Sequence, residues 1–164
     1  MRQIIFLLLL SISLDLRASD FRGINLGESC SQIIGLEISK GSTQIIPNFL
    51  TFKGVFYYKG ILIGDNHTIS YVCDELENLK FVFVKKENET LQDANSYMTN
   101  LTKIISSFHG DPALAIPTQE WKEAGMKDYI YWDLDKKLIQ LRFDNSSSKD
   151  VIWSLTPKSI NDLY

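Results

Sequence analysis

Residues 90–112 read TLQDANSYMTNLTKIISSFHGDP and carry the clearest helical pattern of the chain. Apolar side chains recur there at spacings of three and four, which is the repeat of one helix face; they are Leu91, Ala94, Met98, Leu101, Ile105 and Phe108. Thr90 with Asp93 predicts the start of the helix, and Gly110 with Pro112 predicts its end. A helix with one apolar face has to bury that face, so a covering sheet is expected.

Strand patterns lie on both sides of this helix. Before it, β-branched and aromatic residues predict strands over 52–58, 61–64, 68–73 and 79–85, with turns at 59–60, 65–66 and 74–78. After it, strands are expected over 129–134, 137–143 and 151–155. This spacing is typical of antiparallel meanders.

A shorter helix is expected to precede the first group of strands. Ser29 and Gln32 have the spacing of a capping box, apolar residues follow at Ile33, and Gly41 marks the end of the segment. The order of helix and then strands therefore occurs twice. It predicts an α+β domain with helices packed on one face of a curved antiparallel sheet, and it allows two helix-plus-meander halves.

The N-terminal residues have the pattern of a secretory signal. Arg2 is followed by an apolar run over 4–10 and then by small residues at Ala18 and Ser19. The run is shorter than the roughly 20 residues that cross a bilayer, so a membrane anchor is the weaker interpretation. We therefore expect a signal peptide over 1–19, a single domain over 20–164, and a secreted or periplasmic protein without stable membrane insertion after cleavage.

Export changes how the two cysteines, Cys30 and Cys73, are interpreted. In an oxidising compartment a single pair of cysteines predicts a disulfide, which here would join the first helix to a strand. The functional alternatives are a redox pair, or a nucleophilic thiol assisted by His67 or His109. The sequence lacks the Cys-x-x-Cys spacing of a redox pair, which favours the structural disulfide.

The charge of the chain argues against nucleic acid as a partner. The full chain has 17 basic and 20 acidic residues. Removal of Arg2, Arg17 and Asp15 with the signal peptide leaves a net charge of −4. Only two arginines then remain, Arg22 and Arg142. Phosphate-binding surfaces need clustered lysine and arginine, which this sequence does not provide.

Catalytic and metal-binding patterns are absent from the sequence. It contains neither a glycine-rich phosphate loop nor a nucleophile elbow, and each histidine has one nearby aspartate where a metal site needs three or four ligands. Asp133 and Asp135 form the one carboxylate pair that a small hydrolase could use as general acid and base. We expect no enzyme activity, no cofactor and no metal.

Two short motifs resemble those of a known group of proteins. Leu26-Gly27-Glu28-Ser29, followed by Gln32-Ile33, resembles the helix entry of small envelope domains related to the β-lactamase inhibitor protein and to outer-membrane assembly lipoproteins. Gly110-Asp111-Pro112 resembles their helix exit. The chain departs from the lipoprotein members because no cysteine follows its apolar leader. The resemblance implies a bacterial envelope protein that binds other proteins through its sheet and has no catalytic residues.

Aromatic residues on the predicted strands give a candidate binding surface. Tyr58 ends one strand, and Tyr129 and Tyr131 share one face of another. If helices cover only one side of the sheet, these tyrosines are expected on the free side, where aromatic residues are typical of protein interfaces. The alternative is that the rings pack in the core or across strands.

The sequence therefore predicts a protein-binding module, such as an inhibitor, an immunity factor or an envelope assembly factor, whose partner is another protein. The alternative from a different class is a small-molecule or lipid-binding periplasmic protein with a cavity under the long helix.

Four Asn-x-Ser/Thr sites, at Asn66, Asn88, Asn100 and Asn145, are glycan acceptors only if the chain follows a eukaryotic secretory path.

Overall fold

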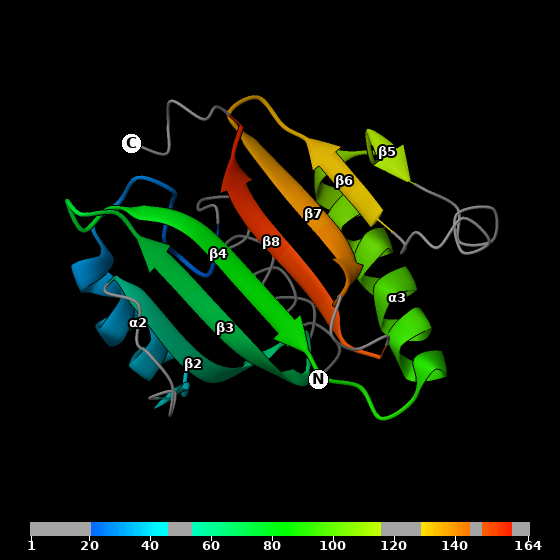
Figure 1. Ribbon diagram of the computed structural model, residues 1–164, viewed down its shortest axis with the longest axis horizontal. Helices are drawn as coiled ribbons and strands as arrows, with labels where there is room; N and C mark the ends of the chain where they lie inside the picture. The colour runs from blue at the N-terminus through cyan, green and yellow to red at the C-terminus, as the bar shows by residue number, and fades with distance from the viewer. Residues whose placement is uncertain (1–20, 46–53, 116–128, 145–148, 159–164) are drawn as a thin grey trace, which may run out of the picture.

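The computed structural model describes residues 21–45, 54–115, 129–144 and 149–158. In these residues the chain has an α+β fold, in which an open antiparallel sheet of eight strands is accompanied by two α-helices (Figure 1). The predicted signal peptide, residues 1–19, lies outside the described residues.

The first half of the fold contains a short 3-10 turn, one α-helix and four strands. Its elements are η1 (Cys30–Gln32), α2 (Ile33–Ser39), β1 (Thr43–Ile45), β2 (Val55–Leu62), β3 (Asp65–Cys73) and β4 (Leu79–Lys86). The second half contains α3 (Leu91–His109), β5 (Leu114–Ala115), β6 (Tyr129–Asp133), β7 (Lys137–Phe143) and β8 (Val151–Pro157). In the described residues each half is thus a helix followed by strands, as the sequence predicts, although the short strands β1 and β5 were not among those expected.

The two groups of strands join into one sheet through their last members. The strand order is β1-β2-β3-β4-β8-β7-β6-β5, so β4 pairs with β8 in the middle and the short strands β1 and β5 form the edges. Every neighbouring pair is antiparallel. Figure 1 shows this seam between the green strand β4 and the red strand β8.

Helix α3 forms where the periodic stretch predicts it. The Thr90 side chain accepts a hydrogen bond from the backbone of Asp93, and the Asp93 carboxylate accepts one from the backbone of Thr90, which completes a capping box. Gly110 ends the helix with a positive φ of 79°. The helix lies against β7 and β8. It buries the middle of its apolar stripe, while Leu91 and Phe108 at the two ends of the stripe stay exposed.

The capping box predicted for the first helix is wrong. The hydroxyl of Ser29 accepts from the backbone N–H of Ser31 and caps the 3-10 turn η1, and α2 begins only after Gln32, whose side chain makes no capping bond. In the predicted capping box Ser29 would bond to the backbone of Gln32, three residues on. Because a 3-10 turn is tighter than an α-helix, Ser29 bonds instead to Ser31, two residues on.

The turn predicted at residues 59–60 is also wrong. Strand β2 runs without interruption through Gly60, and the hairpin reverses at Ile63 and Gly64, both of which have positive φ. Gly60 is needed for a different reason, because a Cβ at this position would collide with the Ser42 hydroxyl oxygen. Glycine here allows a close approach of chain segments and does not form a turn.

Alternation along the strands gives the sheet two different faces. The side that we call the inner face carries two rows of directly paired, apolar residues across six strands: Tyr58, Ile69, Val84, Trp153, Leu141 and Ile130, and Phe56, Tyr71, Val82, Leu155, Ile139 and Trp132. Most of these side chains belong to the core cluster, together with Ala94, Met98, Leu101 and Ile105 of α3 and Ile33 of α2. The core therefore lies on this side of the sheet.

The predicted cysteine pair is confirmed. Cys30 in η1 and Cys73 at the end of β3 form a disulfide pair with their Cα atoms 6.4 Å apart. Backbone hydrogen bonds hold both ends, from Cys30 N–H to the Glu77 carbonyl (2.7 Å) and from Cys73 N–H to the Gly54 carbonyl (2.8 Å). The bridge clamps the N-terminal turn to the sheet, as the sequence predicts.

The helices within the described residues include none that is both long enough and apolar enough to cross a membrane.

Candidate functional site

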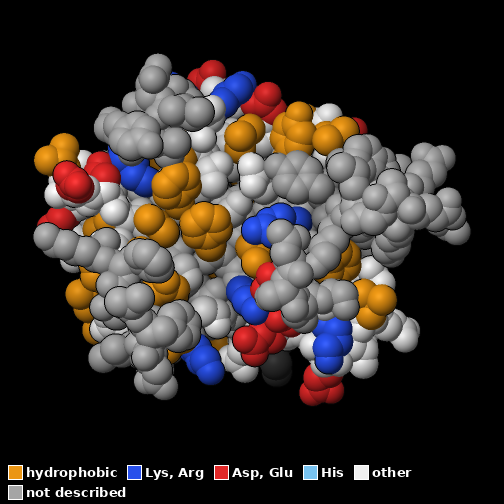
Figure 2. Space-filling model, viewed as in Figure 1, with side chains coloured by type: hydrophobic (Ala, Val, Ile, Leu, Met, Phe, Trp, Pro, Cys, Tyr) orange, Lys and Arg blue, Asp and Glu red, His pale blue; other side chains and the backbone are white. Residues whose placement is uncertain are grey.

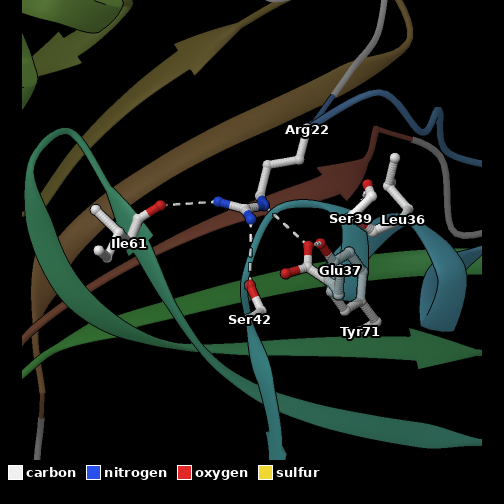
Figure 3. Close-up of polar contacts among 7 residues, drawn as sticks. All are labelled: Arg22, Leu36, Glu37, Ser39, Ser42, Ile61 and Tyr71. Carbon is white, nitrogen blue, oxygen red and sulfur yellow. Dashed lines mark hydrogen bonds and ion pairs between the residues drawn. The ribbon is translucent and has the colours of Figure 1, made fainter.

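A charged cluster lies buried between α2 and the first strands (Figure 3). Glu37 of α2 is completely buried, and its Oε1 atom lies 2.9 Å from Nε of Arg22, whose side chain is nearly buried as well. The hydroxyl of Tyr71, from β3, donates a hydrogen bond to the same carboxylate oxygen. The carboxylate is therefore neutralised by one guanidinium group and held by one phenol.

Arg22 uses its remaining nitrogens to join three parts of the fold. Its Nη1 donates to the backbone carbonyl of Ile61 in β2 (2.9 Å), and its Nη2 donates to the Ser42 hydroxyl (3.2 Å). Figure 3 shows the guanidinium group between these acceptors and Glu37. The planar guanidinium group suits this role because it offers several donors in fixed directions.

Burial keeps the tyrosines of this cluster protonated. The pKa of Tyr71 is raised far above its ordinary value, first by loss of solvent and then by its hydrogen bond to Glu37. The pKa of Tyr58 is raised by burial and by the charge of Glu37. Both phenols are therefore protonated at physiological pH, and Tyr71 is the one that donates to Glu37. Glu37 and Tyr71 are completely buried, so the cluster does not form an open reaction site.

Sequence reasoning missed Arg22 and Glu37. The available signal was the spacing of Ile33 and Glu37, because residues four apart share one helix face and Ile33 belongs on the buried side. A carboxylate on the apolar side of a helix requires a buried partner, and among the described residues that precede Glu37 the basic side chain is Arg22.

The two histidines occupy different environments. His67 of β3 is buried, with Nδ1 2.8 Å from the carbonyl oxygen of Asp65 and Nε2 2.7 Å from the hydroxyl of Tyr97 in α3. His109 is exposed at the end of α3. Neither histidine lies beside the disulfide, so the structure does not bring the residues of a thiol-imidazole pair together.

Burial of His67 predicts a dependence of stability on pH. Loss of solvent lowers its pKa, assisted by the nearby charges of Lys86 and Arg22, while the contacts with Asp65 act in the opposite direction. The unfolded chain, with an ordinary histidine pKa of about 6.5, binds more protons below that pH than the folded chain does. The free energy of unfolding is therefore expected to decrease as the pH falls below about 6.5.

Urea unfolding on the two sides of this pH measures the effect. The variant His67→Gln is expected to flatten the pH dependence, whereas the matched variant His109→Gln at the exposed histidine is expected to remove less of it. An unchanged slope in His67→Gln would contradict the prediction.

The side of the sheet opposite the inner face carries a continuous row of paired residues, and we call this side the outer face. The row crosses all eight strands and consists of Ile45, Tyr57, Ser70, Phe83, Ser154, Gln140, Tyr131 and Leu114. Large side chains alternate with serines in its first half. This arrangement leaves the aromatic rings standing above the sheet with small neighbours on the adjoining strands.

The predicted surface tyrosines are divided between the two faces. Tyr58 is completely buried on the inner face, so its assignment to an exposed surface is wrong. Residue 58 pairs with Ile69, which is also buried, and its neighbour Tyr57 takes the outward position. Tyr131 lies in the outer row and is half-buried. Tyr129 belongs to β6 and pairs with Arg142 of β7. The side chain of Tyr129 lies outside the part of the chain that the structure describes.

Three aromatic residues of the outer face were not singled out from the sequence. Phe81 and Phe83 of β4 stack with ring centroids 6.0 Å apart, and Tyr57 is separated from Phe83 by Ser70. Phe83 is 37% exposed. The alternation of these phenylalanines with Val82 and Val84 was the available signal, but both sets are apolar and periodicity alone does not tell which set faces the core.

A second row of the outer face carries cations on alternate strands. It runs from Lys59 through Thr68, Lys85 and Ile152 to Arg142. Nζ of Lys85 is paired with Asp144 (3.0 Å) and Asp150 (2.9 Å), whereas Lys59 is exposed. Figure 2 shows hydrophobic side chains beside lysine and arginine side chains on the face in view.

The carboxylates considered for acid–base chemistry lie at the end of β6. Asp133 pairs with Lys158, with 2.7 Å between Oδ1 and Nζ, and Asp135 is exposed in the following turn. An exposed carboxylate paired with lysine lacks the burial that a general acid in an active site has. This geometry does not favour the hydrolase alternative.

Three of the four Asn-x-Ser/Thr sites lie within the described residues. Asn66 and Asn100 are exposed. Asn88 uses its amide nitrogen for two hydrogen bonds, to the carbonyls of Lys86 (3.2 Å) and Lys149 (2.8 Å), and so connects the segment before α3 to the segment before β8. Asn145 lies outside the described residues.

Comparison with protein-family models, with curated proteins and with solved structures finds no match to this chain. The resemblance to the β-lactamase inhibitor protein group therefore stays a prediction. Its two motifs coincide with local turn chemistry, since Gly27 has a positive φ of 88° before the cap Ser29 and Gly110 ends α3.

Proposed function

We propose that the chain is an exported protein-binding module without catalytic activity, and that it binds its partner through the outer face. The observation that carries this proposal is the outer row, in which Tyr57, Phe83 and Tyr131 stand out of a sheet whose other side forms the core. Tyrosine and phenylalanine are enriched at the centres of protein interfaces. An inhibitor, an immunity factor or an envelope assembly factor would use such a face.

The proposal includes the arrangement of both helices on the inner face. Two contacts support it. Tyr71 meets Glu37 of α2, and His67 meets Tyr97 of α3. Residues 67 and 71 are separated by an even number of positions in β3, so their side chains lie on one side of the strand. The opposite side is then left uncovered by the helices that the structure describes, and we propose that the partner binds there.

The dimensions of the outer row suit a folded partner. Eight strands at a spacing of about 4.8 Å extend over roughly 34 Å, which is wide enough for the approximately 800 Å² that each protein contributes to a standard interface. Lys59 and Arg142 in the second row complement a partner surface that carries carboxylates, whereas Lys85 of the same row is already paired with Asp144 and Asp150.

The packing of α3 supports protein binding over binding of a lipid in a cavity. Ala94, Met98 and Leu101 of this helix are almost completely buried in the same cluster as the sheet residues. A helix that covers a ligand cavity would instead leave space between its apolar side chains and the strands.

The test is site-specific photo-cross-linking in the intact exported protein. Benzoylphenylalanine is placed at Phe83 on the outer face or, as a matched control, at Phe108 of α3, whose exposure of 39% is close to the 37% of Phe83. The proposal predicts one discrete cross-linked protein species from position 83 and none from position 108. Equal cross-linking from both positions, or none from position 83, would contradict it.

The cross-linked partner then permits a quantitative test. Phe83→Ala and Tyr131→Ala are each expected to weaken binding by about 2 kcal/mol, which is roughly 30-fold in Kd, because aromatic anchors dominate interface energies. Phe108→Ala is expected to bind like the wild type. Titration calorimetry measures the three constants, and wild-type affinity in both outer-face variants would exclude the outer face as the binding surface.

A further inference from the structure

A second candidate site lies beside the disulfide, away from the outer face. An open groove of about 1260 Å³ is lined there by Cys30 and Ile34 from the N-terminal segment and by Cys73, Glu75, Leu76 and Glu77 from β3 and the turn that follows it. The volume is larger than the roughly 300–1,000 Å³ of small-molecule pockets, and the groove is open to solvent, so it suits a chain segment more than a compact ligand.

The groove has exposed apolar side chains at its border. Leu76, at the tip of the turn between β3 and β4, is 81% exposed, and Ile34 of α2 is 43% exposed. Ile38 follows Ile34 by one helical turn and is 64% exposed. A short surface helix normally presents polar residues to water, so Ile34, which lines the groove together with Leu76, and Ile38 on the next turn of α2 indicate a contact surface.

The turn that carries Leu76 is held rigidly. Oδ1 of Asp74 accepts hydrogen bonds from the backbone N–H groups of Leu76 (3.0 Å) and Asn78 (2.8 Å). The Glu77 carbonyl accepts from Cys30 N–H, and the disulfide fixes the same region. A leucine side chain on a fixed turn loses little backbone freedom when a partner covers it.

The charge at the groove is negative. Glu75 and Glu77 are exposed, and neither carboxylate forms an ion pair within the part of the chain that the structure describes. Asp74 is already paired with Lys80 at 3.4 Å. The described residues that line the groove include no lysine, arginine or histidine. A partner of matching chemistry therefore carries positive charge beside large apolar side chains.

We propose that this groove binds a cationic amphipathic segment of another protein. Its apolar side chains contact Leu76 and Ile34, and its lysine or arginine side chains face Glu75 and Glu77. The site is separate from the outer face, and the inference does not depend on the function proposed for that face.

The test uses a fluorescent peptide of alternating lysine and leucine, with a peptide of alternating glutamate and leucine as its charge-reversed counterpart. Fluorescence anisotropy at physiological ionic strength measures binding to the full mature chain. The proposal predicts saturable binding of the lysine peptide and no binding of the glutamate peptide. Equal binding of both peptides, or of neither, would overturn it.

Matched variants locate the binding. Leu76→Ala and the pair Glu75→Lys with Glu77→Lys are expected to weaken binding of the lysine peptide by about tenfold or more each. Ile63→Ala, at the tip of the neighbouring β2–β3 turn and 51% exposed, and Glu87→Lys, at an exposed position after β4, are expected to leave the affinity unchanged.

Equal weakening by the groove variants and their controls would show general adsorption of the cationic peptide to an acidic protein, and would overturn the proposal. Thermal unfolding of each variant accompanies the titration. The substituted side chains are exposed, and the turn is held by backbone groups and by Asp74, so wild-type transition temperatures are expected throughout.

Discussion

Replacement of Glu37 by alanine is expected to lower the free energy of unfolding by about 3–5 kcal/mol, the range measured when one partner of a buried ion pair is removed. The change leaves the guanidinium group of Arg22 nearly buried and without its carboxylate. It also removes the acceptor of the Tyr71 hydroxyl. Urea unfolding followed by circular dichroism measures the difference.

Two further variants separate loss of the charge partner from loss of packing. Arg22→Met combined with Glu37→Leu removes both charges and is expected to recover much of the stability, because apolar residues of similar volume often replace a buried ion pair without loss. Tyr71→Phe removes one hydrogen-bond donor and is expected to cost about 1 kcal/mol. A loss below about 1 kcal/mol in Glu37→Ala would show that the ion pair is not buried as the structure describes.

Removal of the disulfide is the second change with a large expected effect. Cys30 and Cys73 are separated by 43 positions, and the loop-closure relation gives a loss of about 4 kcal/mol for the double variant Cys30→Ala with Cys73→Ala. The loss arises mainly in the unfolded chain, which regains conformational freedom when the bridge is absent. Urea unfolding of the oxidised wild type and of the double variant gives the difference.

Reduction supplies the control for this prediction. Dithiothreitol is expected to lower the stability of the wild type towards that of the double variant and to leave the double variant unchanged. Mass analysis after alkylation is expected to find no modified thiol in the mature, unreduced protein, because the described chain contains no free cysteine. Two alkylated cysteines in exported protein would contradict both the disulfide and the predicted address.

Local chemistry made the second half of the fold predictable. Helix α3 and strands β6, β7 and β8 lie within two residues of the predicted bounds, because a long periodic helix with a capping box and a glycine end has few competing interpretations. The short strands β1 and β5 were not predicted. Strand β1 has three residues and β5 has two, and each is a strand because it pairs with its neighbour in the sheet. A local sequence pattern contains no information about such pairing.

The errors arose where tertiary contacts override local preference. Gly60 resembles a turn residue in the sequence, yet the nearby Ser42 requires glycine inside a continuous strand. Tyr58 and Tyr57 are chemically equivalent neighbours, and only the register with β3 determines which of them enters the core. A shift of one residue exchanges the two sides of a strand. The sequence could therefore predict an aromatic surface on the sheet, but not which of two neighbouring tyrosines belongs to it.

The central position of β8 has a consequence during synthesis. Among the strands that the structure describes, β8 comes last in the chain, yet it fills the middle of the sheet, and Val82, the partner of its Leu155, lies more than seventy residues earlier. Until β8 has been made, the nascent chain exposes the hydrogen-bonding edge of β4 with which β8 pairs, and an exposed strand edge is a template for aggregation. Truncation before residue 151 therefore leaves the two groups of strands without the strand that joins them into one sheet.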